Sequence, residues 1–178
     1  TNLYVADSYN HLIRQIVIST GAVTTLAGTN NYSTDPNLDN GSTDGTGTSA
    51  SFYKPFGITT DGTNLYVADS YNHMIRQIVI STGAVTTLAG TGSPGSTDNP
   101  TGTLASFLYP MGITTDGTNL YVASYGNHTI RKIVIDNGTV TTLAGTGEAC
   151  TSNCDNATGT SAGFSNPGGV TTDGTNLY

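Results

Sequence analysis

A long phrase that recurs along the chain constrains the fold more than any other feature of this sequence. Residues Thr1–Thr29 and Thr63–Thr91 both read TNLYVADSYNH-x-IRQIVISTGAVTTLAGT and differ only at Leu12 and Met74. A third copy starts at Thr118 and reads TNLYVASYGNHTIRKIVIDNGTVTTLAGT. Self-similarity of this kind is the signature of repeat architectures, so we expect one structural unit to stack against copies of itself.

The repeat keeps its extended segments and varies the length of one polar loop. We expect repeat units at about 1–62, 63–117 and 118–174, with the start of a fourth at 175–178. Each loop ends in a similar phrase: TGTSASFYKPFGITTDG, TGTLASFLYPMGITTDG and TGTSAGFSNPGGVTTDG. Surface loops tolerate insertions, so the whole chain, 1–178, is predicted to form one array.

Each unit contains four short extended segments, which in the second unit are Gly57–Thr60, Leu65–Ala68, Met74–Ile80 and Val85–Leu88. The dipeptide Asp61-Gly62 between the first two is a strong tight-turn signal. The third segment has apolar residues on both alternating faces, so it must be covered on both sides. The fourth is rich in threonine and suits an outer edge.

A four-stranded antiparallel sheet that copies of itself cover on both faces is the blade of a β-propeller. The sequence therefore predicts an all-β propeller of four-stranded antiparallel blades, with about three repeats present. No stretch shows a helical period, which excludes helical solenoids. A parallel β-helix is the alternative, but its coils repeat at about 20 to 30 residues. Because propellers use about 4 to 8 blades, we expect a segment of a longer array or a protomer that a neighbouring chain completes.

The phrase LYVADSYNHLIRQI, with F-x-x-P-x-G-I upstream and G-x-V-T-T-L-A-G downstream, resembles the NHL repeat over essentially the whole chain. The third copy departs from it at Ser124 and Thr129. The resemblance implies a propeller, six-bladed in most members, and is closest in character to bacterial-type secreted or surface proteins. Members include protein-binding platforms, RNA-binding modules and a few lyases or lactonases, so the family leaves the function open.

Three polar positions recur in every unit, and we expect them to be structural: Asn10, His11, Arg14, Asn72, His73, Arg76, Asn127, His128 and Arg131. A ring of imidazoles at a metal is the alternative for the histidines. A catalytic site breaks the symmetry of a repeat, whereas these residues obey it, so each histidine is expected to satisfy backbone groups in its own turn. Asp7 and Asp69 lie seven residues before arginines, which predicts a cross-strand ion pair or a turn cap.

Two loops carry further hypotheses. Cys150 and Cys154 predict a local disulfide, with two free thiols as the alternative. Asp35, Asn37 and Asp39 place oxygen ligands at alternate positions, as a calcium loop begins, but glycine comes one place late and no Glu follows. We therefore expect no cofactor and no metal, with calcium at this loop as the alternative.

The charge and composition bound the partners. A net charge of −7, from 5 Lys and Arg against 12 Asp and Glu, argues against nucleic acid, whose phosphates require clustered basic residues. The sequence has no apolar run long enough to span a membrane. Only 10% of residues are charged, and Thr, Ser, Asn and Gly supply the polarity, which is common in secreted and cell-surface β proteins. We therefore expect an extracellular or cell-surface location.

We expect a non-catalytic structural or interaction scaffold that binds another protein or assembles with itself into a ring or filament. A segment of a propeller lyase or hydrolase, with metal ligands in blades outside this sequence, is the alternative. Carbohydrate binding is a third hypothesis, which would use the tyrosines of the turns, although these rings can also pack between blades: Tyr9, Tyr71 and Tyr125.

Overall fold

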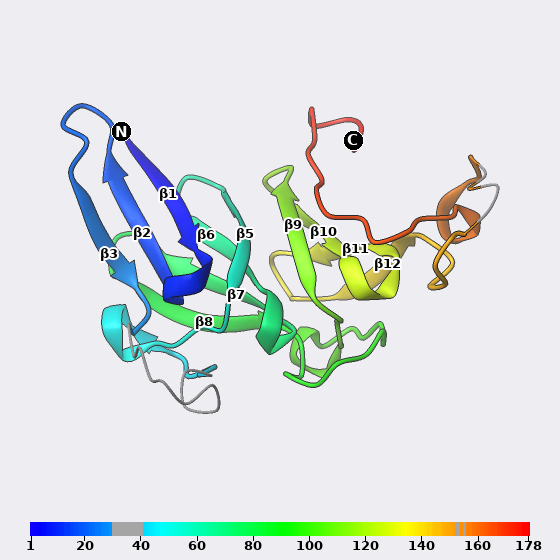
Figure 1. Ribbon diagram of the computed structural model, residues 1–178, viewed down its shortest axis with the longest axis horizontal. Helices are drawn as coiled ribbons and strands as arrows, with labels where there is room; N and C mark the ends of the chain where they lie inside the picture. The colour runs from blue at the N-terminus through cyan, green and yellow to red at the C-terminus, as the bar shows by residue number, and fades with distance from the viewer. Residues whose placement is uncertain (30–40, 152–153, 155) are drawn as a thin grey trace.

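The computed structural model describes residues 1–29, 41–151, 154 and 156–178, and the chain forms three antiparallel sheets in succession (Figure 1). The loop of the calcium hypothesis, with Asp35, Asn37 and Asp39, lies outside the described residues. Each sheet is one blade, and the blades fan out side by side (Figure 1). The fold is therefore an all-β partial propeller, as the repeat predicted. No helix in the described part of the chain is both long and apolar enough to cross a membrane.

The first blade contains β1 (Asn2–Asp7), β2 (Leu12–Val17) and β3 (Val23–Ala27). The second contains β4 (Gly45–Thr46), β5 (Pro55–Thr60), β6 (Asn64–Asp69), β7 (Met74–Val79) and β8 (Ala84–Ala89). The third contains β9 (Pro110–Thr115), β10 (Asn119–Ser124), β11 (Thr129–Val134) and β12 (Val140–Ala144). Single-turn 3₁₀ helices punctuate the chain at η1 (Ser8–Asn10), η2 (Gly47–Ser49), η3 (Ser70–Asn72), η4 (Gly102–Leu104), η5 (Tyr125–Asn127) and η6 (Gly159–Ser161).

The variable loop adds a strand that the sequence did not predict. We expected β8 to form the outer edge of its blade, but Gly45–Thr46 pairs with Val85 and Ala84 and makes the second sheet five-stranded. In the third blade a single antiparallel bridge between Asn99 and Val140 pairs the loop with the outer strand β12 in the same way. An open edge presents unpaired N–H and C=O groups, so the loop satisfies groups that would otherwise invite pairing with another chain.

The innermost strands β5 and β9 run side by side at the narrow end of the fan (Figure 1). A Cβ atom on Gly57 would collide with the carbonyl oxygen of Met111, so only glycine lets the two backbones approach this closely.

Apolar side chains fill the space between neighbouring blades. One cluster, which includes Ile13, Phe52 and Leu65, lies between the first two blades, and a second cluster lies between the second and third. The repeat gives an internal comparison: Leu65 is 1% exposed, whereas Leu3 at the same repeat position is 53% exposed. Full burial of such a side chain is worth about 1.5–3 kcal/mol. A blade therefore gains much of its stability from its neighbour, as in other repeat proteins.

Candidate functional site

The repeated histidines link each blade to the next. The Nδ1 atom of each imidazole accepts a hydrogen bond from a backbone N–H just before the next blade's innermost strand: His11 from Lys54 (3.0 Å), His73 from Tyr109 (3.2 Å) and His128 from Asn166 (3.0 Å). We expected these imidazoles to serve their own turns. The N–H groups that donate to them instead lie one blade further on, because each histidine ends a 3₁₀ turn in the left-handed conformation, where the chain reverses beside the neighbouring blade.

This link predicts acid sensitivity, because an imidazole that accepts at Nδ1 must be neutral. Burial lowers the pKa of His73 below 6.5, so the folded state resists protonation more than the unfolded state does. The contribution of His73 to stability is therefore complete above pH 6.5 and falls as the pH drops from 6.5 towards the lowered folded-state pKa.

The measurement is urea unfolding at pH 7.5 and 5.5 for the protein and for His73→Asn. The Asn side-chain oxygen occupies the position of Nδ1, tolerates the left-handed backbone and does not titrate. We expect the variant to lose less stability on acidification than the protein does. Burial raises the pKa of Asp69 to about 6, but Asp69 is present in both proteins, so its contribution cancels in the difference. Equal losses would contradict the link.

The repeated arginines organise a second set of links. Arg76 is 0% exposed, and its guanidinium contacts Asp69 Oδ2 at 2.9 Å and Asp44 Oδ1 at 2.7 Å. Asp69 is the acid that the seven-residue spacing predicted. Asp44 was not foreseen. It lies in the variable loop and also accepts a hydrogen bond from the backbone of Thr87 on β8, so the loop, the arginine and the outer strand are held together.

The third blade makes the same arrangement without the first acid. Arg131 contacts Asp98 Oδ1 at 2.5 Å, and Asp98 also accepts from the backbone of Thr142. Ser124, which replaces the acid, donates to Asn127 instead. The phrase Gly-Ser-Thr-Asp occurs in both loops, ending at Asp44 and at Asp98, and it was the signal in the sequence for these partners. In the first blade Arg14 contacts Asp7 at 3.5 Å, while Asn10 and Asn72 donate to the acids of their turns.

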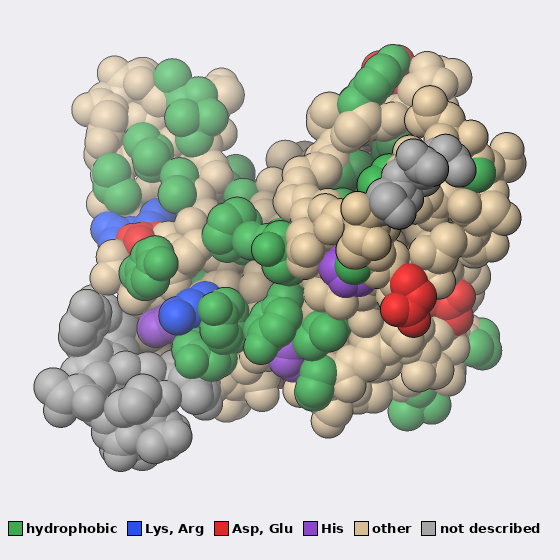
Figure 2. Space-filling view, turned by 45° about the vertical axis from the view of Figure 1, so that its right-hand side comes forward, with side chains coloured by type: hydrophobic (Ala, Val, Ile, Leu, Met, Phe, Trp, Pro, Cys, Tyr) green, Lys and Arg blue, Asp and Glu red, His purple; other side chains and the backbone are tan. Residues whose placement is uncertain are grey.

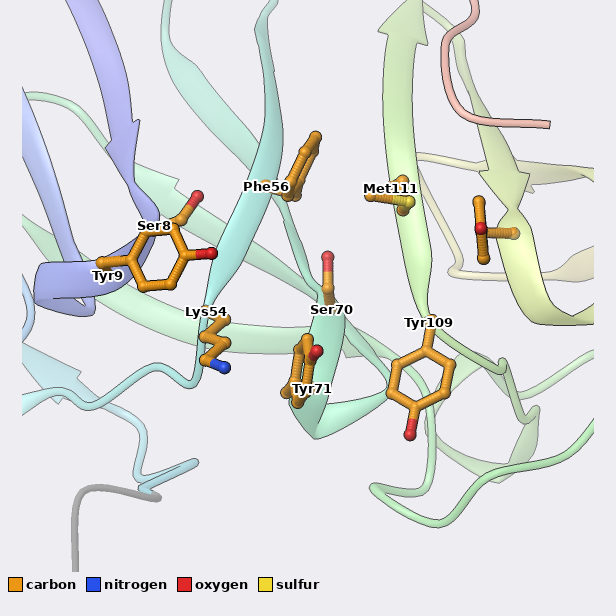
Figure 3. Close-up of a pocket in the computed structure, with 9 residues that line it drawn as sticks. Ser8, Tyr9, Lys54, Phe56, Ser70, Tyr71, Tyr109 and Met111 are labelled. Carbon is orange, nitrogen blue, oxygen red and sulfur yellow. The ribbon is translucent and has the colours of Figure 1, made fainter. Parts of the chain in front are cut away.

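Side chains that recur between repeats and side chains that differ between them meet in one cleft of about 480 Å³. We call it the tyrosine cleft, and the residues that line it come from all three blades (Figure 3): Ser8, Tyr9, Lys54, Phe56, Ser70, Tyr71, Tyr109, Met111 and Tyr125. Hydrophobic side chains, with tyrosine in the same colour, run across the middle of this face beside histidine side chains in Figure 2. Several rings are open to solvent, with Tyr9 80% and Phe56 53% exposed.

Lys54 supplies the charge of the tyrosine cleft. Its Nζ atom lies 4.5 Å from the ring centroid of Tyr71 and 5.7 Å from that of Tyr9, and Figure 3 shows it between these two rings. The lining contains no carboxylate, and none of the ion pairs found among the described residues includes Lys54. The ammonium is thus held by aromatic faces and left without an anionic partner in this part of the chain.

The rings of the tyrosine cleft contact one another at an angle. Tyr71 and Tyr109 have centroids 5.2 Å apart and an interplanar angle of 58°, and His73 meets Tyr109 edge-on at 4.9 Å. Tyr53, which is not among the lining residues, contacts Tyr71 with ring centroids 5.1 Å apart. Angled aromatic pairs of this type are favourable, so the walls of the cleft are held in place before any ligand arrives.

Alignment of the repeats shows how the cleft arises. Lys54, Tyr109 and Asn166 occupy one repeat position, each with φ near 50° and each followed by proline. The carbohydrate hypothesis grouped Tyr125 with the tyrosines of the other turns, but Tyr125 stands at the position of Ser70, and Gly126 takes the position of Tyr71. Tyr9 and Tyr71 are equivalent in the repeat, whereas Tyr125 is not, and all three line one cleft.

The remaining predicted site residues lie elsewhere. Cys150 and Cys154 are joined by a disulfide with 5.5 Å between their Cα atoms, beyond the lining of the tyrosine cleft. Within residues 1–29, 41–151, 154 and 156–178, no three side chains among His, Cys, Asp and Glu are grouped as metal ligands would be.

The stacked sheets and their repeated links define the chain as part of a repeat-built β-propeller. No family model matches the chain. It is 39% identical over 147 residues to NHL repeat-containing protein 2 of Homo sapiens, covering 79% of this chain and 20% of that protein. It is 36% identical over 138 residues to Protein SUPPRESSOR OF QUENCHING 1, chloroplastic, of Arabidopsis thaliana, covering 76% of this chain and 13% of that protein. These similarities support the assignment of the repeats to the NHL-repeat family.

Solved structures support the fold. An auxiliary nutrient binding protein from Bacteroides thetaiotaomicron superposes with a TM-score of 0.70 at 19% identity, over 97% of this chain and 40% of the other. A chain of the nidogen/laminin complex superposes with a TM-score of 0.59 at 18% identity, over 99% of this chain and 66% of the other. At these identities the likeness concerns the propeller architecture alone. The chain spans a fifth or less of the length of the two relatives described above.

Proposed function

We propose that this chain is a non-catalytic interaction scaffold and that the tyrosine cleft is the surface that contacts a protein partner. The observation that carries the proposal is the cleft itself, in which exposed aromatic rings converge from three blades around one cation that has no anionic partner among the described residues. Tyrosine is enriched among the residues that dominate binding energy at protein interfaces. One solved structure with a similar fold comes from a protein complex, that of nidogen with laminin, so this architecture is compatible with such a role.

The recurring polar residues hold the blades together, which supports the absence of catalysis. The histidines and arginines that recur are engaged in links between or within blades. The cleft is lined instead by recurring tyrosines, such as Tyr71, and by departures from the repeat, such as Lys54. Rigid walls reduce the entropy lost on binding, so a cleft held by a propeller is suited to recognition. A lyase or hydrolase segment is the less supported alternative.

The test is a selection from a random peptide library against the protein, with each binder scored on two variants. Tyr71→Ser removes a central ring of the cleft, and Leu104→Ser removes an exposed apolar side chain outside it, since Leu104 is 60% exposed and absent from the lining. We expect binders to lose at least about tenfold in affinity for the first variant, or 1.4 kcal/mol, and to retain affinity for the second. Binders whose affinity is unchanged by Tyr71→Ser would overturn the proposal.

We also propose that copies of the chain associate through the outer face of the first blade. Leu3 is 53%, Val5 39% and Val23 50% exposed there, while their counterparts in the second blade are buried under the first. Sedimentation velocity at increasing concentration is expected to show association that Leu3→Asp abolishes. Monomer at every concentration would contradict this part of the proposal.

An extracellular or cell-surface location is proposed from the disulfide between Cys150 and Cys154, because disulfides persist in oxidising compartments. The protein isolated from its source is expected to show no thiol reactivity after denaturation without a reductant. Two reactive thiols would contradict this location.

A further inference from the structure

We propose that the tyrosine cleft binds an extended peptide segment that carries a single carboxylate among apolar side chains. This inference rests on the proposed function and specifies the chemistry of the partner. Its three elements are the charge of the cleft, the arrangement of its rings and the charge of the whole chain.

The charge of the cleft selects a carboxylate. Among the lining residues that the structure describes, Lys54 Nζ is the only formal charge, and it lies near the rings of Tyr71 and Tyr9 without a carboxylate from this part of the chain. Lys54 is half-buried, so a ligand oxygen can approach its ammonium from the solvent. A charge-assisted hydrogen bond formed there is stronger than a neutral one, so a ligand with one carboxylate gains most.

The rings of the cleft favour an apolar extended segment over a sugar. Tyr71 and Tyr109 meet at 58°, and the Lys54 ammonium already lies over the face of Tyr71. A sugar ring needs a free flat aromatic face, whereas short aliphatic and proline side chains fit between angled rings. Extended, proline-containing peptides dock into aromatic-lined grooves of this type. The lining comes from three successive blades, which gives the cleft the length that an extended segment requires.

The charge of the whole chain limits the number of carboxylates. The net charge of −7 repels a polyanionic partner, while charges beyond about 8 Å are screened at physiological ionic strength. A single carboxylate next to Lys54 is attracted by that cation, whereas further carboxylates outside the cleft are repelled by the net negative charge of the chain. This selects a peptide with one acid over an acidic tract or a nucleic acid.

The experiment uses synthetic acetylated peptides in which a central Glu, Gln or Lys is flanked by Pro and Leu, measured by fluorescence polarisation. The protein is compared with Lys54→Asn. Asparagine stands at the same position two units further on, as Asn166, with φ 52° and the same backbone hydrogen bond to a histidine, so the variant keeps the local fold. We expect the Glu peptide to bind about tenfold more tightly than the Gln peptide, and this preference to vanish in Lys54→Asn.

The outcomes separate this inference from the proposed function. Binding that requires Tyr71 but treats Glu, Gln and Lys alike would overturn the carboxylate inference and leave the scaffold in place. A preference for Glu that survives Lys54→Asn would overturn the role of Lys54. Binding of a glycan array that depends on Tyr71, with no peptide bound, would overturn the peptide as occupant. If no peptide or glycan binds in a way that depends on Tyr71, the proposal of an interaction scaffold is itself overturned.

Discussion

Arg76→Met is expected to destabilise the protein by roughly 3–5 kcal/mol, measured as the change in the free energy of unfolding in urea. The side chains of Arg76 and Asp69 are both 0% exposed and contact each other at 2.9 Å. Without the cation, Asp69 must either keep a stranded charge in a core that water cannot reach or take up a proton, since burial already raises its pKa to about 6. The energetic cost comes chiefly from the stranded charge, or from the protonation that relieves it, rather than from the lost contact.

Two matched variants separate the stranded charge from the loss of the arginine. Arg131→Met removes an equally buried guanidinium, but its acid Asp98 has a side chain that is 44% exposed and can be hydrated, so we expect a clearly smaller loss. Asp69→Ser introduces the residue that the third blade has at this position, Ser124. In this variant Arg76 keeps its contact with Asp44. Equal losses for Arg76→Met and Arg131→Met would show that the buried carboxylate is not the cause.

Gly57→Ala is expected to lower the free energy of unfolding by roughly 3 kcal/mol, because one added methyl group has no room. The new Cβ would collide with the Met111 carbonyl oxygen and lie 3.0 Å from the backbone nitrogen of Ile113. Both are backbone atoms of β9, which cannot rotate away as a side chain can. The two innermost strands would have to separate, and the apolar contacts between the second and third blades would weaken with them.

The chain supplies a control at the same repeat position. Gly169 corresponds to Gly57 in the last unit, and a Cβ atom there meets nothing within 4 Å. Gly169→Ala is therefore expected to leave stability unchanged or slightly raised, because alanine restricts the unfolded chain more than glycine does. Thermal unfolding of both variants makes the comparison. A similar loss in both would contradict the close approach of β5 to β9.

Much of the fold could be predicted because the repeat encodes it locally. The apolar residues on both faces of the third segment required cover on both sides, and Ile75 and Ile78 are indeed buried in opposite interfaces. The pairing of Asp69 with Arg76 followed from their spacing on neighbouring strands. The strand β4 could not be predicted in this way, since it comes from a loop that differs in every unit and pairs only after the blade has formed.

Links between units were harder to predict than links within them. The histidines could be identified as structural, but their partners, such as the N–H of Tyr109 for His73, lie one blade further on. Asp44 and Asp98 meet arginines more than thirty residues away. The phrase Gly-Ser-Thr-Asp marked both acids, although only the stacking of loop on blade shows what they contact.

The tyrosine cleft escaped prediction for a different reason. Its distinctive residues are departures from the repeat, such as Lys54 where the next unit has Tyr109. A search for what recurs finds the residues that hold the blades together and passes over the residues that differ. The same comparison, read for its exceptions, would have pointed to Lys54.

The central claim is that the repeated histidines and arginines hold the blades, whereas the tyrosine cleft, in which Lys54 departs from the repeat, recognises a partner. The most direct test measures two quantities on Lys54→Asn: its affinity for the glutamate peptide and its midpoint of unfolding in urea. The claim predicts a loss of about tenfold in affinity, or 1.4 kcal/mol, with an unchanged midpoint. Unaltered affinity, or a midpoint lowered as far as in Gly57→Ala, would contradict it.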